Sequence, residues 1–350
     1  MQVIPEWLEL ISLAFCMGVI VCRLWVFTPS AQSEFSYQAD FVSGMWTLFC
    51  FGLAVLIIGS IIELLSRTAD MSGQPFPAFF SVVPTVLFRT HYGSVWITRI
   101  GALFLMSLSK VALRYRENRA FLFFMLSLGL IVSMTVSASG HASDAGDFSL
   151  PEIMDWLHLL AASVWGGGLM VLSTSVLPNL IGREAIATLI ARVAGRFSAM
   201  AGFAVGTVAI TALYNAWLYV GSVNALLKTP YGWTVISKII LFFILVNLGG
   251  FNRYVSVPLL NEWAGVSAKD RGIFTRIALR LFPRFQLGGN GRRISARFMR
   301  SVKVEAILII GVLLCAAILR HEIPARHLSH LGHTGGEGQS MPHHNHGGDM

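Results

Sequence analysis

The chain has 350 residues, of which 55% are hydrophobic and only 13% are charged. A soluble domain carries about 25% charged residues, so these charges are too few to cover the surface of a soluble protein of this length. The net charge of +8 does not require a nucleic-acid partner, because one basic segment accounts for it (below). The composition therefore excludes a soluble protein and indicates a membrane protein whose main neighbour is lipid.

The apolar residues form long blocks, and about 20 of them in a helix span a bilayer core. The first block carries no preceding Lys or Arg and no cleavage site, which favours a retained helix over a signal peptide. Residues 75–88, "PFPAFFSVVPTVLF", are shorter and interrupted by proline, so we interpret them as an interfacial or re-entrant segment. The alternation typical of a membrane β-barrel is absent. The sequence predicts an all-α polytopic transmembrane helical bundle of about eight spans, at 7–27, 41–65, 95–113, 120–138, 153–177, 198–222, 233–251 and 302–319.

Basic residues fall in alternate connections and predict the orientation of the bundle. They gather after the third span, after the fifth span and in the segment 253–303, which alone contributes +9 and lies next to anionic headgroups. The stretch 137–155 has no Lys or Arg and four acids. The basic connections are therefore predicted to be cytoplasmic, and both termini periplasmic.

A weak internal repeat relates the two halves of the chain. "THYGSVWITRI" (90–100) aligns with "TPYGWTVISKI" (229–239), and "EWLEL" (6–10) resembles "DWLHL" (155–159). The alignment places Glu9 opposite His158 and Arg99 opposite Lys238. Parallel repeats of this kind occur in transporters, with sites near the repeat interface. We predict an N-terminal four-helix half at 1–140, a C-terminal four-helix half at 141–320 and a polar tail at 321–350.

Polar side chains near or inside the spans are the candidates for function. Glu63 and Arg67, four residues apart, are expected to form a local ion pair, and Arg99 and Lys238 to extend towards the interface. The histidines outside the tail all lie at or near the predicted periplasmic ends of spans: His91, His141, His158 and His321.

His158 stands out because polar groups inside a span are costly and usually functional. Met154 precedes it by four residues and shares its helix face. Imidazole with thioether is a soft ligand pair suited to copper, particularly Cu(I). Asp155 could instead orient the other imidazole nitrogen. A buried histidine bonded to a neighbouring helix, with methionine as packing, remains the alternative.

The tail differs from the rest of the chain because it is polar and rich in glycine and histidine. Such a segment cannot form a packed core and is predicted to be disordered without a ligand. Short His-rich tracts bind metals, and the methionines favour copper, either Cu(I) or Cu(II). Its predicted ligands are His327, His330, His333, His343, His344, His346 and Met341.

Four segments resemble the copper-resistance D family: "DWLHLLAASVWGGGL" (155–169), "RFSAMAGFAV" (196–205), "TPYGWTVISKIILFFILVNLGGFNR" (229–253) and "VKVEAILIIGVLLCAAIL" (302–319). The resemblance implies a bacterial inner-membrane protein that moves copper into the cytoplasm beside a periplasmic copper-binding partner of the copper-resistance C type. The "GHA" element of the family falls on Gly140, His141 and Ala142, and its "LH" on Leu157 and His158. The His-rich tail is not part of the resemblance.

The leading functional hypothesis is copper uptake from the periplasm, with the tail collecting the metal and no catalysis. No ATPase motif is present, neither a DKTG-like sequence nor GxxxxGK[ST], so transport is expected to be facilitated or ion-coupled. One alternative is a periplasm-facing copper acceptor or assembly factor without transport. Another is a haem-binding redox protein, which generally needs paired histidines deep in the bilayer, whereas only His158 lies clearly within a span.

Overall fold

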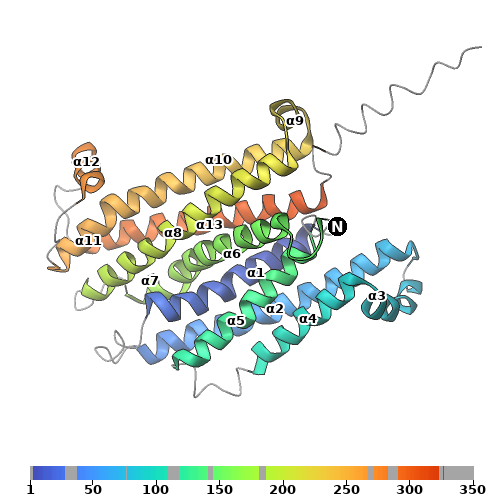
Figure 1. The fold of residues 1–350 in the computed structure, drawn as a ribbon. Helices are drawn as coiled ribbons and strands as arrows, with labels where there is room; N and C mark the ends of the chain where they lie inside the picture. The colour runs from blue at the N-terminus through green and yellow to red at the C-terminus, as the bar shows by residue number, and fades with distance from the viewer. Residues whose placement is uncertain are drawn as a thin grey trace, which may run out of the picture.

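The computed structural model describes residues 3–27, 38–75, 77–108, 118–140, 145–180, 187–266, 272–282, 291–322 and 326. These residues form helices and connections, with no β-strand among them (Figure 1). The predicted all-α helical bundle is confirmed.

The elements run in the following order. α1 (Val3–Val21) continues into the π-helical turn η1 (Cys22–Val26), α6 (Leu150–Val171) into η7 (Leu172–Val176), and α10 (Pro230–Phe251) into η9 (Asn252–Ser256). The others are α2 (Gln38–Ser72), η3 (Ala78–Ser81), α3 (Val83–Arg89), α4 (His91–Ser107), α5 (Arg119–Ala138), α7 (Leu177–Leu180), α8 (Ala187–Tyr219), α9 (Val223–Lys228), α11 (Val257–Trp263), α12 (Ile273–Leu281) and α13 (Gly291–His321).

Within the described residues, seven helices are long and apolar enough to cross a membrane. They correspond to seven of the eight predicted spans. The remaining predicted span, 95–113, corresponds to α4, which has 17 residues and begins earlier, at His91. Residues 109–117 lie outside the described residues. The stretch 75–88 contains η3 and most of α3, two short helices, in agreement with a segment too short to span. The predicted span 233–251 is longer in the structure, because the helix continues through η9 to Trp263.

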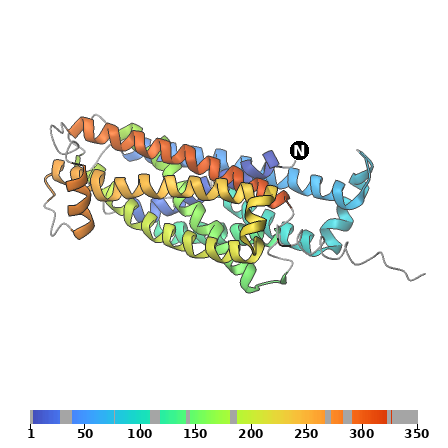
Figure 2. The same cartoon turned by 90° about the horizontal axis from the view of Figure 1, so that it is seen from above.

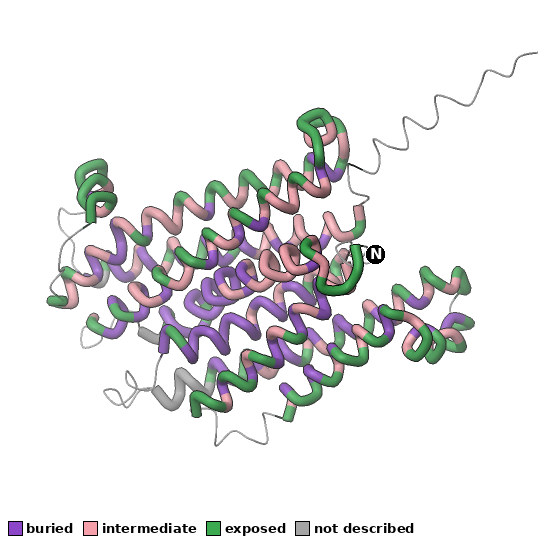
Figure 3. Tube along the Cα trace, in the orientation of Figure 1, coloured by how far each residue is buried: buried purple, intermediate pink, exposed green. Residues whose placement is uncertain are grey.

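The helices form an elongated bundle with α1 at its centre (Figures 1 and 2). α1 packs against α2, α5, α6 and α13. Of its most apolar window 78% is buried, against 11% for the helix that contains α10, so α10 lies at the outside of the bundle, where Figure 3 shows it mostly intermediate or exposed. The N-terminus, α3 and α9 lie at one end, hereafter the α3–α9 end, and α7, α11 and α12 lie at the opposite α12 end.

The aligned repeat segments fold in the same way. Thr90 caps α4 by accepting a hydrogen bond from the Gly93 amide at 3.0 Å, and Thr229 caps α10 by accepting one from Gly232 at 2.9 Å. A Cβ at either glycine would lie within 2.3 Å of a carbonyl oxygen of the preceding short helix. Both positions therefore require glycine for α3 and α9 to fold back closely. The helix pairs α1–α2 and α6–α8 also correspond, as do α4–α5 and α10–α13. These likenesses support the duplication.

Glycines allow the first helices of the two halves to cross at the centre of the bundle. A Cβ on Gly167 of α6 would lie 1.7 Å from the Ala14 carbonyl oxygen of α1, and one on Gly18 would lie 2.2 Å from the Gly167 carbonyl carbon. Small residues permit this close approach, which is how helices associate within lipid. The contact of α1 with α6 depends on both glycines.

We expect Gly167→Ala to destabilise the protein by more than the ~1–3 kcal/mol typical of overpacking, because the new methyl group meets backbone that cannot rotate away. Gly206→Ala is the matched control, since it lies on α8 with nothing within 4 Å of its Cβ position. Thermal unfolding in detergent should show a lower midpoint for Gly167→Ala alone. Equal midpoints would contradict the proposed crossing.

Candidate functional site

His158 lies where α6 meets α8 and α10. Its Nδ1 is 2.9 Å from Oγ1 of Thr211 on α8, and this hydroxyl donates its own hydrogen to the Thr207 carbonyl oxygen at 2.8 Å. In this arrangement the Thr211 oxygen accepts a hydrogen bond from Nδ1–H while its own hydrogen stays within α8. The tautomer fixed in this way leaves Nε2 with its lone pair, the atom able to bind a metal.

Nε2 of His158 faces an amine. The Nζ atom of Lys238 on α10 lies 3.5 Å away. A copper ion bound to Nε2 would be close to this ammonium group, and their repulsion is strong in a partly buried site. Metal binding to His158 thus requires Lys238 to move away or to lose its proton.

Asp155 bonds to Ser137 and not to the His158 imidazole, the partner that the sequence suggested. Ser137 Oγ donates a hydrogen bond to Asp155 Oδ2 at 2.7 Å, while Thr211 occupies the Nδ1 position of His158. Met154, one turn before His158, is partly buried on the same helix. The sequence interpretation missed Thr211, because only the register of α8 against α6 places its hydroxyl beside the His158 ring. The repeat alignment did contain a signal for Lys238.

The aligned residues of the first half also face each other. Arg99 Nη1 donates to Glu9 Oε1 at 3.0 Å and also to Glu63. Arg99 is fully buried, and its second Nη group donates to the Thr135 carbonyl oxygen at 2.9 Å and to Ser139 Oγ at 2.7 Å. The expectation that Arg99 extends to the interface is wrong, because two carboxylates and a carbonyl hold it inside.

The expected local pair of Glu63 and Arg67 is not what the structure shows. Glu63 pairs with Arg99, while Arg67 donates to the Ser139 carbonyl oxygen at 2.8 Å and lies 4.4 Å over the Tyr92 ring. The buried Arg99 offers Glu63 a partner shielded from solvent, which a sequence spacing of four could not reveal.

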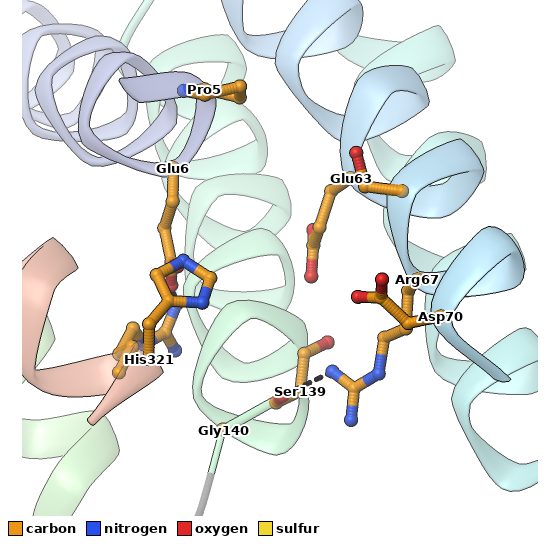
Figure 4. Close-up of a pocket in the computed structure, with 10 residues that line it drawn as sticks. Pro5, Glu6, Glu63, Arg67, Asp70, Ser139, Gly140 and His321 are labelled. Atoms are coloured by element: carbon orange, nitrogen blue, oxygen red, sulfur yellow. Dashed lines mark hydrogen bonds and ion pairs between the residues drawn. The ribbon is translucent and has the colours of Figure 1, made fainter. Parts of the chain in front are cut away.

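A polar cavity of about 230 Å³ adjoins this network: Glu63 lines it, together with residues from the first turn of α1 and the last turns of α2 and α13, at the α3–α9 end. Figure 4 shows Glu6, Glu63, Asp70 and His321 around it. Its other lining residues are Pro5, Ser66, Arg67, Ser139, Gly140 and Arg320. Arg320 and His321 both contact Glu6, each at 2.7 Å. The cavity combines carboxylates, an imidazole and guanidinium groups from α1, α2 and α13.

The other predicted ligands are only partly described. His91 Nε2 lies 2.9 Å from Asp147 Oδ1 in an exposed pair. The described histidines, His91, His158 and His321, each have separate partners, and no three His, Cys, Asp or Glu side chains of the described ranges gather as a metal site. The remaining predicted ligands lie outside the described residues: His141, His327, His330, His333, His343, His344, His346 and Met341.

Sequence comparison relates both halves to one family. The profile "Copper resistance protein D-like, N-terminal domain" matches residues 1–149, and the profile "Copper resistance protein D" matches residues 191–319. The chain belongs to the copper-resistance protein D family. The two matches include Glu9, Arg99, Thr211 and Lys238; neither matched range includes His158 or the tail.

Three relatives of this copper-resistance D family member are named for copper or for the inner membrane. "Copper transport protein CutJ" of Bacillus subtilis is 28% identical over 72% of this chain and 48% of its own length. "Copper resistance protein D" of Pseudomonas syringae is 24% identical over 78% of the chain and 84% of its own length. "Inner membrane protein YebZ" of Escherichia coli is 29% identical over 60% of the chain and 70% of its own length. The chain thus spans about half the length of the Bacillus relative. No solved structure matches it significantly.

We expect Arg99→Met to destabilise this copper-resistance D protein by about 3–5 kcal/mol, because it leaves Glu9 and Glu63 buried without a cation. Adding Glu9→Gln and Glu63→Gln should recover most of the loss. Lys238→Met, the matched change in the second half, should cost less, since the contact of Lys238 at 3.5 Å is with the His158 ring and not with a carboxylate. Unfolding midpoints in detergent measure all three, and an equal loss for Arg99→Met and Lys238→Met would contradict the assignment.

Proposed function

We propose that this protein carries copper across the bacterial inner membrane, entering at the α3–α9 end, which we assign to the periplasm. The family and the names of the Bacillus and Pseudomonas relatives favour copper handling in a membrane. The basic residues of α12, at the opposite end, favour a cytoplasmic position for that end. The protein acts as a carrier, with no catalytic step.

The polar cavity at the α3–α9 end is the observation that carries this proposal. Gly140 lines it, and the next residue is His141; His321 also lines it, and the His-rich tail follows. Two predicted ligand segments therefore leave from the rim of one cavity. Its lining carries three carboxylates, Glu6, Glu63 and Asp70, against two guanidinium groups, Arg67 and Arg320, so a cation delivered there would compete for carboxylates that now pair within the protein.

From this cavity we propose that copper passes to His158 and Met154, with His141 and His91 as further ligands at the entrance. Nε2 of His158 already has its lone pair available because Thr211 holds the other nitrogen as N–H. Lys238 keeps this atom covered while no metal is bound. The imidazole–thioether pair suits Cu(I), and the tail would bind either Cu(I) or Cu(II).

A periplasmic copper-binding protein of the copper-resistance C type is the proposed donor at the α3–α9 end. The acceptor or assembly role remains the second candidate, because the cavity and tail would serve it equally without any flux. A haem protein is less favoured. Of the histidines that the structure describes, His158 alone lies in the bundle interior, and its nitrogens face Thr211 and Lys238.

Copper uptake into vesicles of defined orientation tests the proposal. His158→Ala and His141→Ala should abolish flux, because they remove ligands of the transported ion. In a chain ending after His321, which lacks the tail ligands, they should also abolish copper binding. A chain ending after His321 should lower only the apparent affinity, since the tail collects metal without forming the path. Asn247→Ala is the control, because this exposed asparagine on α10 bonds only to its own helix.

Metal content is measured on the same preparations. Copper that binds and never crosses in any variant would contradict transport and leave the acceptor role. Flux unchanged in both histidine variants would contradict the proposed path.

We further expect Lys238→Met to raise the affinity for Cu(I) by about tenfold or more, because it removes the like charge facing Nε2. Flux should fall, since the metal then leaves His158 more slowly. Lys228→Met on the exposed α9 is the control, as it removes a lysine from the same end of the bundle. Competition with a Cu(I) chelator gives the affinity, and a weaker affinity in Lys238→Met would show that the lysine supports the site instead.

A further inference from the structure

A buried carboxyl group lies on α13, on the side of the bundle away from the cavity. Glu305 is 3% exposed, and its Oε1 accepts a hydrogen bond from Asn252 Nδ2 at 2.5 Å and one from Ser301 Oγ at 3.4 Å. Asn252 also donates to Ser301 Oγ at 2.9 Å and accepts from Ser256 Oγ at 3.0 Å. Four polar side chains thus converge between α13 and the π-helical turn η9.

Glu305 has no cationic partner among the described residues. Arg253, next to Asn252, donates instead to the Ser198 carbonyl oxygen at 2.5 Å, and Lys303 is exposed. The charged residues on the elements packed against α13 are Glu6, Glu9, Glu152, Asp155, Lys238, Arg253 and Glu262, and α13 itself carries Arg297 and Arg300 in the turns before Glu305. No charged side chain of the described ranges bonds to Glu305.

An unpaired buried carboxylate is costly, and in lipid such a group instead holds a proton. The π-helical turn adds a second signal, because π-bulges inside helices frequently occur at functional sites. Asn252 is the first residue of η9 and Ser256 the last. The irregular turn places both polar side chains in one cluster with Glu305.

The position of the cluster relates it to the copper path. Asn252 follows Lys238 by 14 residues on the continuous α10–η9 helix, a distance of about 21 Å at 1.5 Å per residue. The cluster therefore lies well beyond His158 towards the α12 end. The cluster has no sulfur or imidazole ligand: Asn252 presents its N–H groups to Glu305 and Ser301, and the carboxyl and hydroxyl oxygens suit a proton and not Cu(I).

We propose that Glu305, held by Asn252, Ser256 and Ser301, binds the proton that is exchanged against copper during transport. The inference rests on the proposed transport function. As the metal cation passes, the O–H bond of the carboxylic acid breaks and the proton passes to water on one side. The carboxylate takes up a proton from the other side once the metal has left. A copper cation inside the bundle favours the charged carboxylate over the neutral acid, so the proton is held only while copper is absent and the two cations move in opposite directions.

Proteoliposomes containing a pH-sensitive dye, with copper ions added outside, test the exchange. The wild type should move protons when copper enters, and an imposed pH gradient should change its copper flux. Glu305→Gln keeps the shape and a hydrogen-bond acceptor for Asn252, so proton movement should fall to the level of protein-free vesicles while copper still binds at the cavity end. Glu262→Gln is the control, because it makes the same change at an exposed position on nearby α11.

Infrared spectra of the purified protein supply a readout that does not depend on flux. The wild type should show the C=O band of a protonated carboxylic acid at neutral pH, and Glu305→Gln should lack it. A missing band in the wild type, or unchanged proton movement in Glu305→Gln, would overturn the proposal.

The remaining outcomes separate this inference from the proposed function. Copper flux without proton movement in the wild type, or coupling to a sodium gradient instead, would overturn proton exchange and leave copper transport standing. No copper flux in the wild type would overturn transport itself, and the exchange with it.

Discussion

The close contact of α1 with α6 is the constraint on which the rest of the structure depends. Gly18 and Gly167 leave so little space between the two backbones that a single Cβ would force the helices apart. α1 carries Glu6 and Glu9, and α6 carries Met154, Asp155 and His158. The crossing therefore sets both polar sites of the bundle relative to one another, and α2, α8 and α13 pack around it.

The two halves place different residues at the same pair of equivalent positions, Glu9 with Arg99 in the first half and His158 with Lys238 in the second. In the first half, Arg99 is held by two carboxylates, a carbonyl and hydroxyl groups, and each nitrogen of its guanidinium group has a partner. In the second half, Lys238 faces His158 at the longer distance of 3.5 Å. A buried pair that loses one partner is strongly destabilised, so the first arrangement is fixed. The second can open, which is the property a transient metal ligand needs.

The proposed path connects three polar regions through an apolar bundle. Carboxylates and His321 gather at the α3–α9 end, His158 follows with Lys238, and Glu305 lies further towards the α12 end. The ligand chemistry changes along the way, from mixed nitrogen and oxygen, through imidazole and thioether, to oxygen alone. A soft ion held by His158 and Met154 would find only weak ligands near Glu305, which favours its release there.

The sequence by itself determined the class of the protein, most of its spans and the pairing within its repeat. Long apolar blocks specify transmembrane helices because lipid offers no hydrogen bonds to the backbone, and a repeated Thr-x-Tyr-Gly motif specifies the same capped turn at Thr90 and Thr229. The repeat alignment also made Glu9 equivalent to His158 and Arg99 equivalent to Lys238, and in the structure the two residues of each half lie together. Only the tertiary structure decided which groups meet across helices: Thr211 on His158, Glu63 on Arg99, and Asn252 on Glu305. These contacts depend on the rotation and register of helices far apart in the chain, and hydrophobic blocks without a strong amphipathic stripe carry little information about either.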